Sequence, residues 1–534
     1  MSTSSSPFDA LVFTNRFVGD LPEDPIPDNF VRRVQGAAYS RVSPTPVSAP
    51  KLVSVIPEMI QALGFPRDAA SHPDFLNVFS GNTIHPGMAP YATCYGGHQF
   101  GHWAEQLGDG RAINLGEVLC PSGQHLTLQL KGAGRTPYSR SADGRAVLRS
   151  SLREYLCSEA IHHLGIPTTR SLCLVLTGDS VIRDMFYDGH AKAEPGAIAC
   201  RIAPSFTRFG HFELPSSRGD LDLLKQLVHH SLQVEFEGRF NPDVEGYCEW
   251  FEEVALKTAR LMVDWQRVGF VHGVMNTDNL SILGLTIDYG PYGWLEGFDP
   301  LWTPNTTDAG GRRYAYGQQP LIARWNLIRL ANAIYPLIGK AQRLEDAIER
   351  YDQTFKTLWL DAIHHKLGLD RSTSPLREAL IERLWQLLLL RETDFTLFFR
   401  GLSFWEPPHP GTPIDQIPHF LRAAWYDETP PSHAIETQSL EWLRDYTHEV
   451  HEGGVLEQDR QLRMQAVNPK FIFRNYLAQE VIDEIERGGT DKLERLLNAL
   501  RRPFDEQPEN EDFAQKRPEW ARHRAGCSML SCSS

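Results

Sequence analysis

Short apolar runs separated by glycine fill the chain between about residue 91 and residue 245. Alternating or β-branched runs of this length are typical of strands, and they predict strands at 112–118, 126–131, 172–177, 181–186 and 197–203. Gly178-Asp179 predicts a hairpin turn between the third and fourth strands. One apolar pattern with a period of about 3.6 residues predicts a helix over 146–164, which Gly165 and Pro167 end.

From about residue 246 onward, apolar residues recur every three or four positions, which is the pattern of amphipathic helices. This pattern predicts helices at 247–268, 321–338, 341–367, 375–399, 436–453 and 478–500. Residues 280–288 are the exception, because two short apolar runs hinged at Gly284 predict a small hairpin. The sequence therefore predicts an α+β fold of two lobes, one strand-rich and one larger and helical, with a ligand-binding cleft between them.

The composition is that of an ordinary globular protein. Of 534 residues, 41% are hydrophobic, 22% charged and 10% aromatic, which excludes a largely disordered or fibrous chain. The net charge of -14 argues against a surface that binds nucleic acid over a wide area. The first residues do not resemble a leader peptide, and the apolar run at 384–390 is far shorter than the roughly 20 residues of a membrane span. We therefore expect a cytoplasmic monomer without nucleic-acid or membrane partners.

Glycine-containing segments and a lysine in the strand-rich region are candidates for phosphate binding. In Gly108-Asp109-Gly110-Arg111, the glycines allow backbone amides to approach a phosphate and Arg111 adds charge, although the segment is also typical of a hairpin turn. Lys131 ends a predicted strand and is either a phosphate ligand or an edge residue that reaches water. Asp143 and Gly144 precede the predicted helix, and a simple helix cap explains them equally well.

Three charged residues in apolar surroundings depend on partners that the sequence alone does not identify. Glu154 lies on the predicted helix, where it either faces solvent or holds Lys131 in place, as the helix glutamate of protein kinases holds its strand lysine. Arg201 and Arg208 lie in or just after an apolar strand. Each of them must pair with an anion if it is buried, whereas an exposed sheet edge is the alternative.

Residues 271–290 contain the sharpest group of candidate catalytic side chains. Asn279 and Asp288 supply two oxygen ligands that suit Mg²⁺, which takes its other ligands from water and phosphates. Asp278, beside them, is a candidate acceptor for the proton of an attacking hydroxyl. In protein kinases the catalytic aspartate follows the loop histidine by two residues. Here Val274 occupies that position after His272, so a conventional kinase base is missing.

Longer segments of the chain carry a family resemblance. They include YGGHQFGHWAEQLGDGRAINLGE, LQLKGAGRTPYSRSADGRAVLRSSLREYLCSEA, GFVHGVMNTDNLSILGLTIDYGP and NPKFIFRNYLAQ. On these segments the chain resembles the selenoprotein O (SelO, or YdiU) family of protein adenylyltransferases, which have a protein-kinase-like fold of two lobes. Together with the strand and helix patterns above, this predicts four regions: an N-terminal extension (1–90), an N-lobe with nucleotide-binding loops (91–245), a helical C-lobe with the metal and catalytic loop (246–480), and a C-terminal helix with a cysteine-containing tail (481–534).

The resemblance also implies an activity. ATP would bind in an orientation flipped relative to kinases, and AMP would pass to Ser, Thr or Tyr hydroxyls of proteins with release of pyrophosphate. The implied cofactor is Mg²⁺ or Mn²⁺, with Asn279 and Asp288 as its ligands. Asp278 would accept the proton, and Glu154 would position Lys131. The residues implied to bind the nucleotide are Gly108, Gly110, Arg111, Lys131, Asp143, Gly144, Arg201, Arg208 and Asp288.

The C-terminal cysteines leave several alternatives open. By resemblance, Cys532 occupies a position where the family carries selenocysteine or cysteine, which makes it a candidate redox residue. Some relatives pair it with a cysteine shortly after the DYG segment, but this chain has Pro304 in that region, and Cys527 is the substitute partner. Two reduced thiols on a mobile tail are the plain alternative. The activity has alternatives too: a nucleotide-binding redox scaffold, a UMP transferase that uses UTP and Mn²⁺, and an ordinary phosphoryl-transferring kinase.

Overall fold

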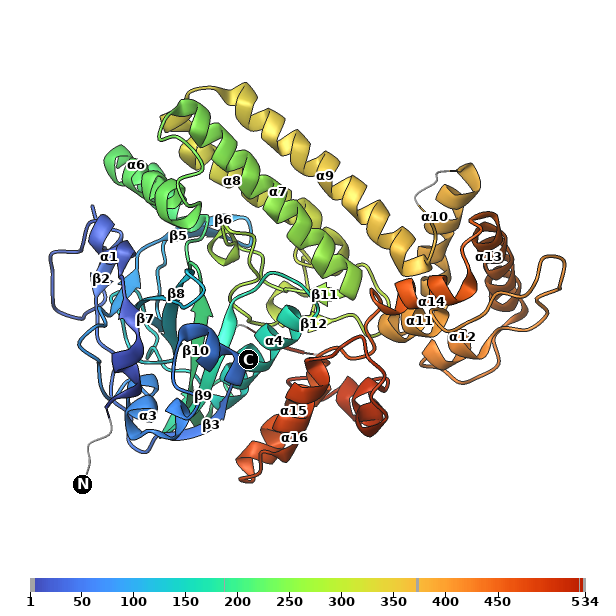
Figure 1. Ribbon diagram of the computed structural model, residues 1–534, viewed down its shortest axis with the longest axis horizontal. Coiled ribbons are helices and arrows are strands. Elements are labelled where there is room, and N and C mark those ends of the chain that lie inside the picture. The colour runs from blue at the N-terminus through green and yellow to red at the C-terminus, as the bar shows by residue number, and fades with distance from the viewer. Residues whose placement is uncertain (1–4, 187, 371–373, 528, 532–534) are drawn as a thin grey trace.

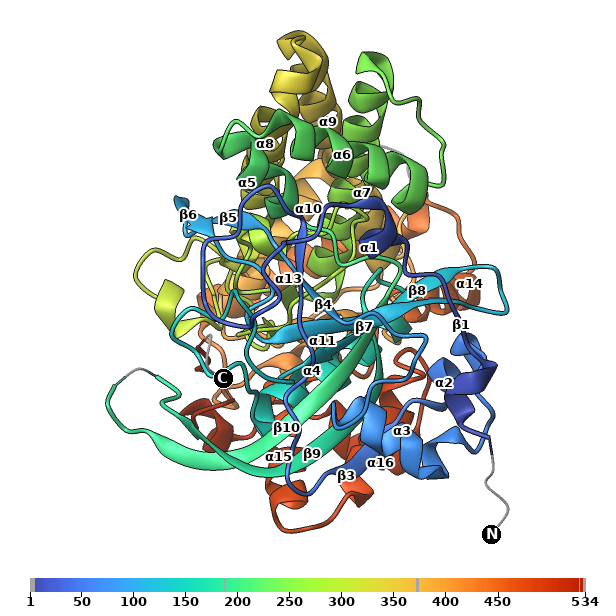
Figure 2. The same cartoon turned by 90° about the vertical axis from the view of Figure 1, so that its left-hand side faces the viewer.

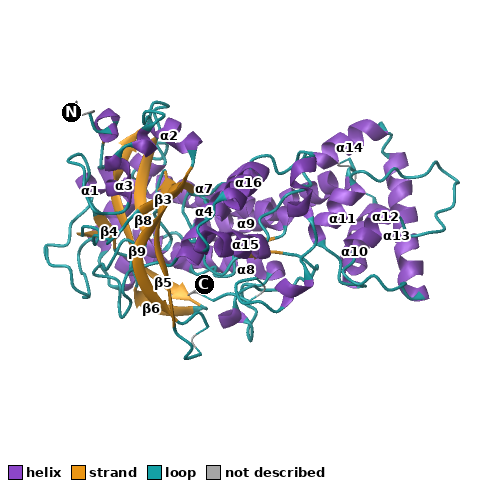
Figure 3. Cartoon of the chain, turned by 90° about the horizontal axis from the view of Figure 1, so that it is seen from below, coloured by secondary structure: helices purple, strands orange, loops and turns teal. Residues whose placement is uncertain are grey.

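Strands gather at one end of the molecule and helices make up most of the remainder (Figure 1; Figure 3), which is the arrangement of an α+β fold. The computed structural model describes residues 5–186, 188–370, 374–527 and 529–531. Its strands are β1 (Val12–Phe13), β2 (Tyr39–Arg41), β3 (Lys51–Val55), β4 (Tyr91–Thr93), β5 (Gly96–Gln99), β6 (His102–Gln106), β7 (Ala112–Leu119), β8 (His125–Lys131), β9 (Arg170–Arg183), β10 (Lys192–Ala203), β11 (Phe270–Val271) and β12 (Gly293–Trp294).

The helices confirm most of the predicted segments. Those expected at 146–164, 247–268, 321–338, 341–367 and 436–453 are present with small shifts of their ends. The α-helices are α1 (Arg16–Asp20), α2 (Pro57–Leu63), α3 (Pro73–Phe79), α4 (Leu148–His163), α5 (Gly210–Ser217), α6 (Leu221–His230), α7 (Val244–Val268), α8 (Gln319–Ile338), α9 (Ala341–Leu367), α10 (Pro375–Leu389), α11 (Phe395–Leu402), α12 (His419–Ala424), α13 (His433–Glu452), α14 (Glu457–Gln465), α15 (Asn475–Glu486) and α16 (Asp491–Leu500).

The main sheet has eight strands in the order β2-β4-β7-β8-β10-β9-β3, with β1 paired to β7, and its neighbours are antiparallel. Strands β2 and β3 come from the Pro-rich N-terminal segment and lie at the two ends of this order. Figure 2 shows β9 and β10 as a long two-stranded ribbon that projects from the sheet. A smaller hairpin, β5-β6, forms a separate sheet near helix α5.

The predicted hairpin turn at Gly178-Asp179 is wrong, because β9 runs through it without a break. The chain reverses instead between the end of β9 at Arg183 and the start of β10 at Lys192. Gly178 is needed for a close approach: its φ is +77°, and a Cβ atom there would lie 2.6 Å from the Cβ of Ala49. The backbone N–H of Ala49 donates to Thr177 O at 3.0 Å, so the glycine accommodates the N-terminal segment.

Two of the predicted helices are each divided in the structure. The segment 375–399 is interrupted before Asp394, whose carboxylate caps the new helix α11 by accepting the backbone N–H of Leu397 at 3.0 Å. The segment 478–500 is divided between α15 and α16, where Gly488 adopts a φ of +93° that ends the first helix. None of the described helices combines the length and apolar character that a membrane crossing requires.

The predicted hairpin over 280–288 is also wrong. Its two halves pair with other segments, Ser281 with Arg208 and Thr286 with Thr168. Gly284 turns the chain, and a Cβ atom there would lie 2.9 Å from the Cβ of Lys257. Residues 280–288 therefore do not pair with each other. They contact Arg208, Thr168 and helix α7 instead.

Helix α4 is buried between β9 and β10 on one side and α15 and α16 on the other. Its charged side chains are buried with partners: Arg149 lies 2.7 Å from Glu194, and Glu159 lies 2.7 Å from Arg170. Burial of such groups is tolerated because each charge is paired. The charged positions on this helix are therefore interior contacts rather than a solvated face.

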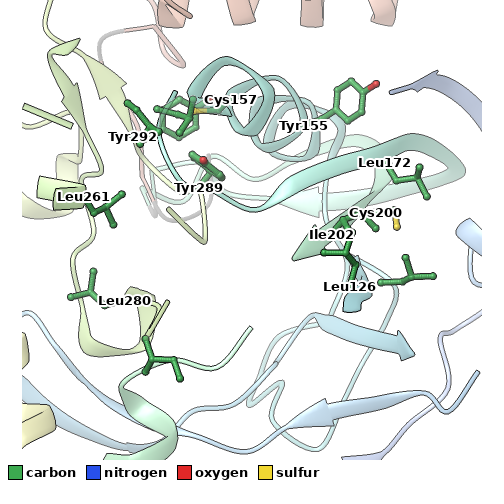
Figure 4. Packing of buried hydrophobic residues seen from close by; sticks show 14 of the residues in the cluster. Leu126, Tyr155, Cys157, Leu172, Cys200, Ile202, Leu261, Leu280, Tyr289 and Tyr292 are labelled. Carbon is green, nitrogen blue, oxygen red and sulfur yellow. The ribbon is translucent and has the colours of Figure 1, made fainter. Parts of the chain in front are cut away.

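Aromatic side chains fix α4 to the segment that follows residue 288. Figure 4 shows Cys157 on the side of α4 that faces Tyr289 and Tyr292, whereas Tyr155 points away from them. All four side chains are at most 4% exposed. The Tyr292 hydroxyl donates to the backbone carbonyl of Arg153 at 2.7 Å. The position of residue 288 is therefore set by packing against the same helix that carries Glu154.

Candidate functional site

A cavity of about 890 Å³ opens between the sheet and the segments that carry residues 278 and 288. Its walls come from the loop before β7, the loop between β8 and α4, the ends of β9 and β10, and these two segments. The cavity brings together ten of the predicted site residues, which are Gly108, Gly110, Arg111, Lys131, Asp143, Gly144, Arg201, Arg208, Asp278 and Asp288. Two more lie outside the lining: Glu154 contacts Lys131 and Arg201 of the lining, and Asn279 follows Asp278 in the chain.

Two glycines in the cavity wall occupy positions that a side chain would disrupt. Gly108 has a φ of +86°, and a Cβ atom there would lie 2.4 Å from the ring of Tyr138. Gly144 has a φ of +72°, and its Cβ atom would lie 2.1 Å from the carbonyl oxygen of Gly134. Beside it, Asp143 accepts hydrogen bonds from Arg183, whose Nη2 lies 2.7 Å from Oδ1. Close packing against the Tyr138 ring and against the backbone of Gly134 therefore requires glycine at these two positions.

Lys131 and Glu154 form an ion pair at 2.6 Å, which identifies the partner of each. Glu154 is 2% exposed and also lies 2.8 Å from Arg201 Nη1, so it does not face solvent. Burial raises the pKa of Glu154, but Lys131 and Arg201 outweigh burial and lower the pKa to about 2. Burial lowers the pKa of Lys131 to about 7 against the attraction of Glu154, with Arg201 and Arg111 adding to the decrease. An anionic ligand in the cavity would stabilise the charged lysine.

Two buried arginines hold the carboxylate of Asp288. Arg201 Nη1 lies 2.6 Å from Oδ1, and Arg208 Nη1 donates to Oδ2 in a very short contact. Both arginines are at most 2% exposed, so the expectation that a cation in this strand pairs with an anion is confirmed. Asp288 adopts a left-handed φ of +55°, which is unusual for a residue with a side chain and is common at functional sites.

Asp278 is a buried carboxylate in the cavity wall. Gln99 Nε2 donates to its Oδ2 at 3.1 Å, whereas Oδ1 is buried and has no hydrogen-bond partner among the described residues. Burial raises the pKa of Asp278 to about 6; the hydrogen bond from Gln99 and the charge of Arg208 oppose this increase, and the charge of Glu213 adds to it. A carboxylate of this kind is ionised at neutral pH yet basic enough to accept a proton.

The predicted metal ligands are near each other in sequence but engaged with protein groups. Asn279 Nδ2 donates to Val274 O at 3.0 Å, and within the described chain its Oδ1 accepts no hydrogen bond. No cluster of three or more His, Cys, Asp or Glu is arranged to hold a metal among the residues that the structure describes. Mg²⁺ typically uses only one or two carboxylates and completes its shell with water and substrate phosphates. Asn279 Oδ1, which accepts no hydrogen bond within the described chain, and the carboxylate of Asp288 are therefore oxygen donors of the kind that such an ion takes.

Several cavity residues were not identified from the sequence. Gln99 lies in a segment whose two glycines permit close approach, and a Cβ atom at Gly97 would lie 2.8 Å from Asp278 Oδ1. The glycines around Gln99 were the sequence feature that could have indicated this close approach. The other unforeseen charged residues of the lining are Asp109, Arg135, Arg140, Arg145, Arg183 and Asp184. In total, eight basic and five acidic side chains line the cavity, so it carries an excess of positive charge in an acidic protein.

Of the two candidate redox cysteines, the structure describes only Cys527. Cys532 lies outside the described residues. Cys527 is 3% exposed rather than on a mobile tail, and burial raises the pKa of its thiol to about 12, which suppresses the reactive thiolate. Residues 529–531 lie against Pro304, because the backbone N–H of Leu530 donates to Pro304 O at 3.1 Å.

Comparison with known proteins assigns the family. The family model described as protein adenylyltransferase SelO matches residues 29–501. The chain belongs to the SelO family. Among its relatives, the protein nucleotidyltransferase YdiU of Aromatoleum aromaticum is 55% identical over 528 residues, which cover 98% of this chain and 99% of the relative. The YdiU proteins of Rhodopirellula baltica and an Azoarcus species are each 53% identical, again over 98% of this chain and 99% of the relative.

SelO membership places the chain in a family of nucleotidyltransferases. The SelO match contains every residue of the cavity, from Tyr95 to Asp288, together with Glu154 and Asn279. Cys527 and Cys532 lie beyond its end.

Proposed function

We propose that this SelO-family chain is a protein adenylyltransferase, which transfers AMP from ATP to Ser, Thr or Tyr hydroxyls of proteins and releases pyrophosphate. The observation that carries the proposal is the position of Asp278. Its buried carboxylate, with an oxygen that has no partner among the described residues, borders a cavity lined by eight basic side chains. A proton acceptor beside a polyphosphate-binding cavity is the arrangement that nucleotidyl transfer to a hydroxyl requires.

The basic side chains account for binding and for the leaving group. The triphosphate of ATP carries close to four negative charges, and the lining has three more basic than acidic side chains. When the bond between the α-phosphorus and its bridging oxygen breaks, negative charge accumulates on the departing pyrophosphate. The buried Arg201 and Arg208 and the half-buried Lys131 are cations suited to stabilise that charge, which favours pyrophosphate as the leaving group.

Asp278 acts on the acceptor. The hydroxyl oxygen attacks the α-phosphorus while its proton passes to the carboxylate of Asp278, whose pKa of about 6 leaves it ionised at pH 7. Gln99 holds the second carboxylate oxygen and so orients the first. Bound Mg²⁺ would neutralise phosphate charge, and Asn279 and Asp288 are the residues that would hold it.

The proposal includes a protein-kinase-like fold of two lobes with ATP in a flipped orientation. The ion pair of Lys131 with Glu154, reached from a strand and a helix as in protein kinases, supports this. In this proposal the extension (1–90), the N-lobe (91–245), the C-lobe (246–480) and the C-terminal helix and tail (481–534) are the four regions of the chain. The missing kinase base at Val274 and the alternative carboxylate at Asp278 favour AMP transfer over ordinary phosphoryl transfer.

The position of the label in ATP tests the proposal. The protein is incubated with a mixture of acceptor proteins and with ATP labelled at either the α- or the γ-phosphate, and protein-bound label is measured for the wild type and for Asp278→Asn. Label from the α-position alone, lost in Asp278→Asn, is expected. Label from the γ-position alone would establish a kinase. If the protein binds ATP but no label is transferred, the result would favour the alternative of a nucleotide-binding scaffold. Labelled UTP, tested with Mg²⁺ and with Mn²⁺, measures the preference for UMP transfer in the same assay.

A further inference from the structure

Trp325 and two arginines form a cationic aromatic cluster on the surface of helix α8. The guanidinium carbon of Arg313 lies 4.7 Å from the centre of the indole ring, and that of Arg329 lies 4.8 Å from it. All three side chains are half-buried. Neither arginine forms a salt bridge within the described parts of the chain, although Arg324 on the same helix is paired with Asp352 at 2.8 Å. We call Arg313, Trp325 and Arg329 the α8 cluster.

The cluster is tied to the proposed catalytic carboxylate through the tip of the β5-β6 hairpin. Gln99 donates to Asp278 at 3.1 Å, and the backbone N–H of the next residue, Phe100, donates to the hydroxyl of Tyr314 at 2.9 Å. One residue further, a Cβ atom at Gly101 would lie 3.5 Å from the guanidinium carbon of Arg313. The residue that contacts Asp278 and the residue that lies against Arg313 are therefore only two positions apart on the hairpin.

The electrostatics around the cluster favour an anionic partner. The whole chain carries a net charge of -14, so an acidic segment is repelled by most of the surface. Near the cluster, Asp308 is 3% exposed and accepts the backbone N–H groups of Arg313 and Tyr314, so its carboxylate is already engaged. Arg312 is exposed and adds a further positive charge. Guanidinium groups stacked on an aromatic ring retain donors at their edges for carboxylates.

We propose that the α8 cluster binds acidic side chains that flank the acceptor hydroxyl in the protein substrate. The inference rests on the proposed function, because it takes Asp278 as the residue beside which the hydroxyl is placed. A substrate segment whose hydroxyl reaches Asp278 crosses the β5-β6 tip, and residues two or three positions away lie over Arg313 and Arg329. The cluster thus selects hydroxyls followed or preceded by glutamate or aspartate at that spacing.

Peptide binding tests this without requiring catalysis. Two fluorescein-labelled peptides each contain one serine, with glutamates two and three positions to either side in one peptide and glutamines in the other. Binding to the full-length protein is measured by fluorescence anisotropy with a saturating ATP analogue that cannot release pyrophosphate. The glutamate peptide is expected to bind about tenfold more tightly than the glutamine peptide, and the difference should shrink as salt is added.

Variants locate the preference. Arg313→Gln combined with Arg329→Gln should reduce binding of the glutamate peptide to the level of the glutamine peptide, whereas the matched control Arg324→Gln should keep the tenfold preference. Arg329→Glu should instead bind a lysine-flanked peptide better than the wild type does, which guards against loss of folding as the explanation. Equal binding of the two peptides, no binding of either, or an unchanged preference in the double variant would each overturn the proposal.

The same peptides separate this proposal from the proposed function. Charge-selective binding without transfer of label from the α-phosphate of ATP would retain the docking surface and refute adenylylation. Transfer to both peptides at equal rates would retain adenylylation and refute the docking surface.

Discussion

The hydrogen bond from Gln99 to Asp278 should set the pH at which transfer activity is lost on the acid side. The carboxylate must be ionised to accept a proton, and burial raises its pKa to about 6, so activity should decline as the pH falls through about 6. Gln99 stabilises the ionised form by donating to Oδ2 at 3.1 Å. Gln99→Ala removes this donor, so the pKa of Asp278 should rise and the acid limb should move to higher pH.

The size of this shift follows from the strength of the bond. A hydrogen bond to a charged group contributes about 1.5 kcal/mol or more, and one pKa unit corresponds to about 1.4 kcal/mol. Gln99 is half-buried and its bond is of ordinary length, so a shift of about one unit is expected. The transfer activity of Gln99→Ala should therefore be about fivefold lower than that of the wild type at pH 6, and nearly equal to it at pH 8.

The assay is the pH dependence of kcat/KM for α-labelled ATP with one acceptor protein, measured in parallel for wild type and variants. Glu213→Gln should move the limb the opposite way, because the charge of Glu213 raises the pKa of Asp278. His102→Ala, an exposed change on the same hairpin, is the control and should leave the limb in place. An acid limb that does not move in Gln99→Ala, or that moves to lower pH, would refute the assignment of this limb to Asp278.

Three further predictions concern the ion pairs. Glu154→Gln should weaken ATP binding about tenfold in calorimetry, because Lys131 loses the carboxylate that positions it; unchanged affinity would contradict that role. Asp288→Ala should abolish metal-dependent label transfer yet bind metal-free ATP more tightly, since two arginines lose their internal anion; full retained activity would refute the metal assignment. Asp394→Asn should lower the free energy of unfolding in urea by about 3 kcal/mol, because it leaves the buried Arg474 unpaired; a loss under about 1 kcal/mol would show that the pair is dispensable.

The sequence predicted the elements whose boundaries are marked by local signals. Helix α4 and the strands β7, β8 and β10 have a clear apolar period, and Gly165 with Pro167 ends the helix region where predicted. Gly178 misled the prediction because a glycine serves equally for a turn and for contact with a distant segment. Its partner, Ala49, is remote in sequence, so no local pattern distinguishes the two uses.

The same distinction separates the site residues that were identified from those that were missed. Lys131, Asp278 and Asp288 lie in short segments whose chemistry is readable from neighbouring residues. The partners that give them their properties, such as Glu213 beside Asp278, come from other elements. The apolar pattern around Arg201 did not decide whether its side chain is buried. The structure shows that it is buried and paired with Glu154 and Asp288.

The central claim is that a hydroxyl beside Asp278 receives AMP. The most direct measurement is mass spectrometry of an acceptor protein after incubation with the enzyme, ATP and Mg²⁺, with Asp278→Asn in parallel. The account predicts that Ser, Thr or Tyr side chains gain the mass of one AMP group with the wild type and remain unmodified with the variant. A gain of a phosphate group alone, or equal modification by Asp278→Asn, would contradict it.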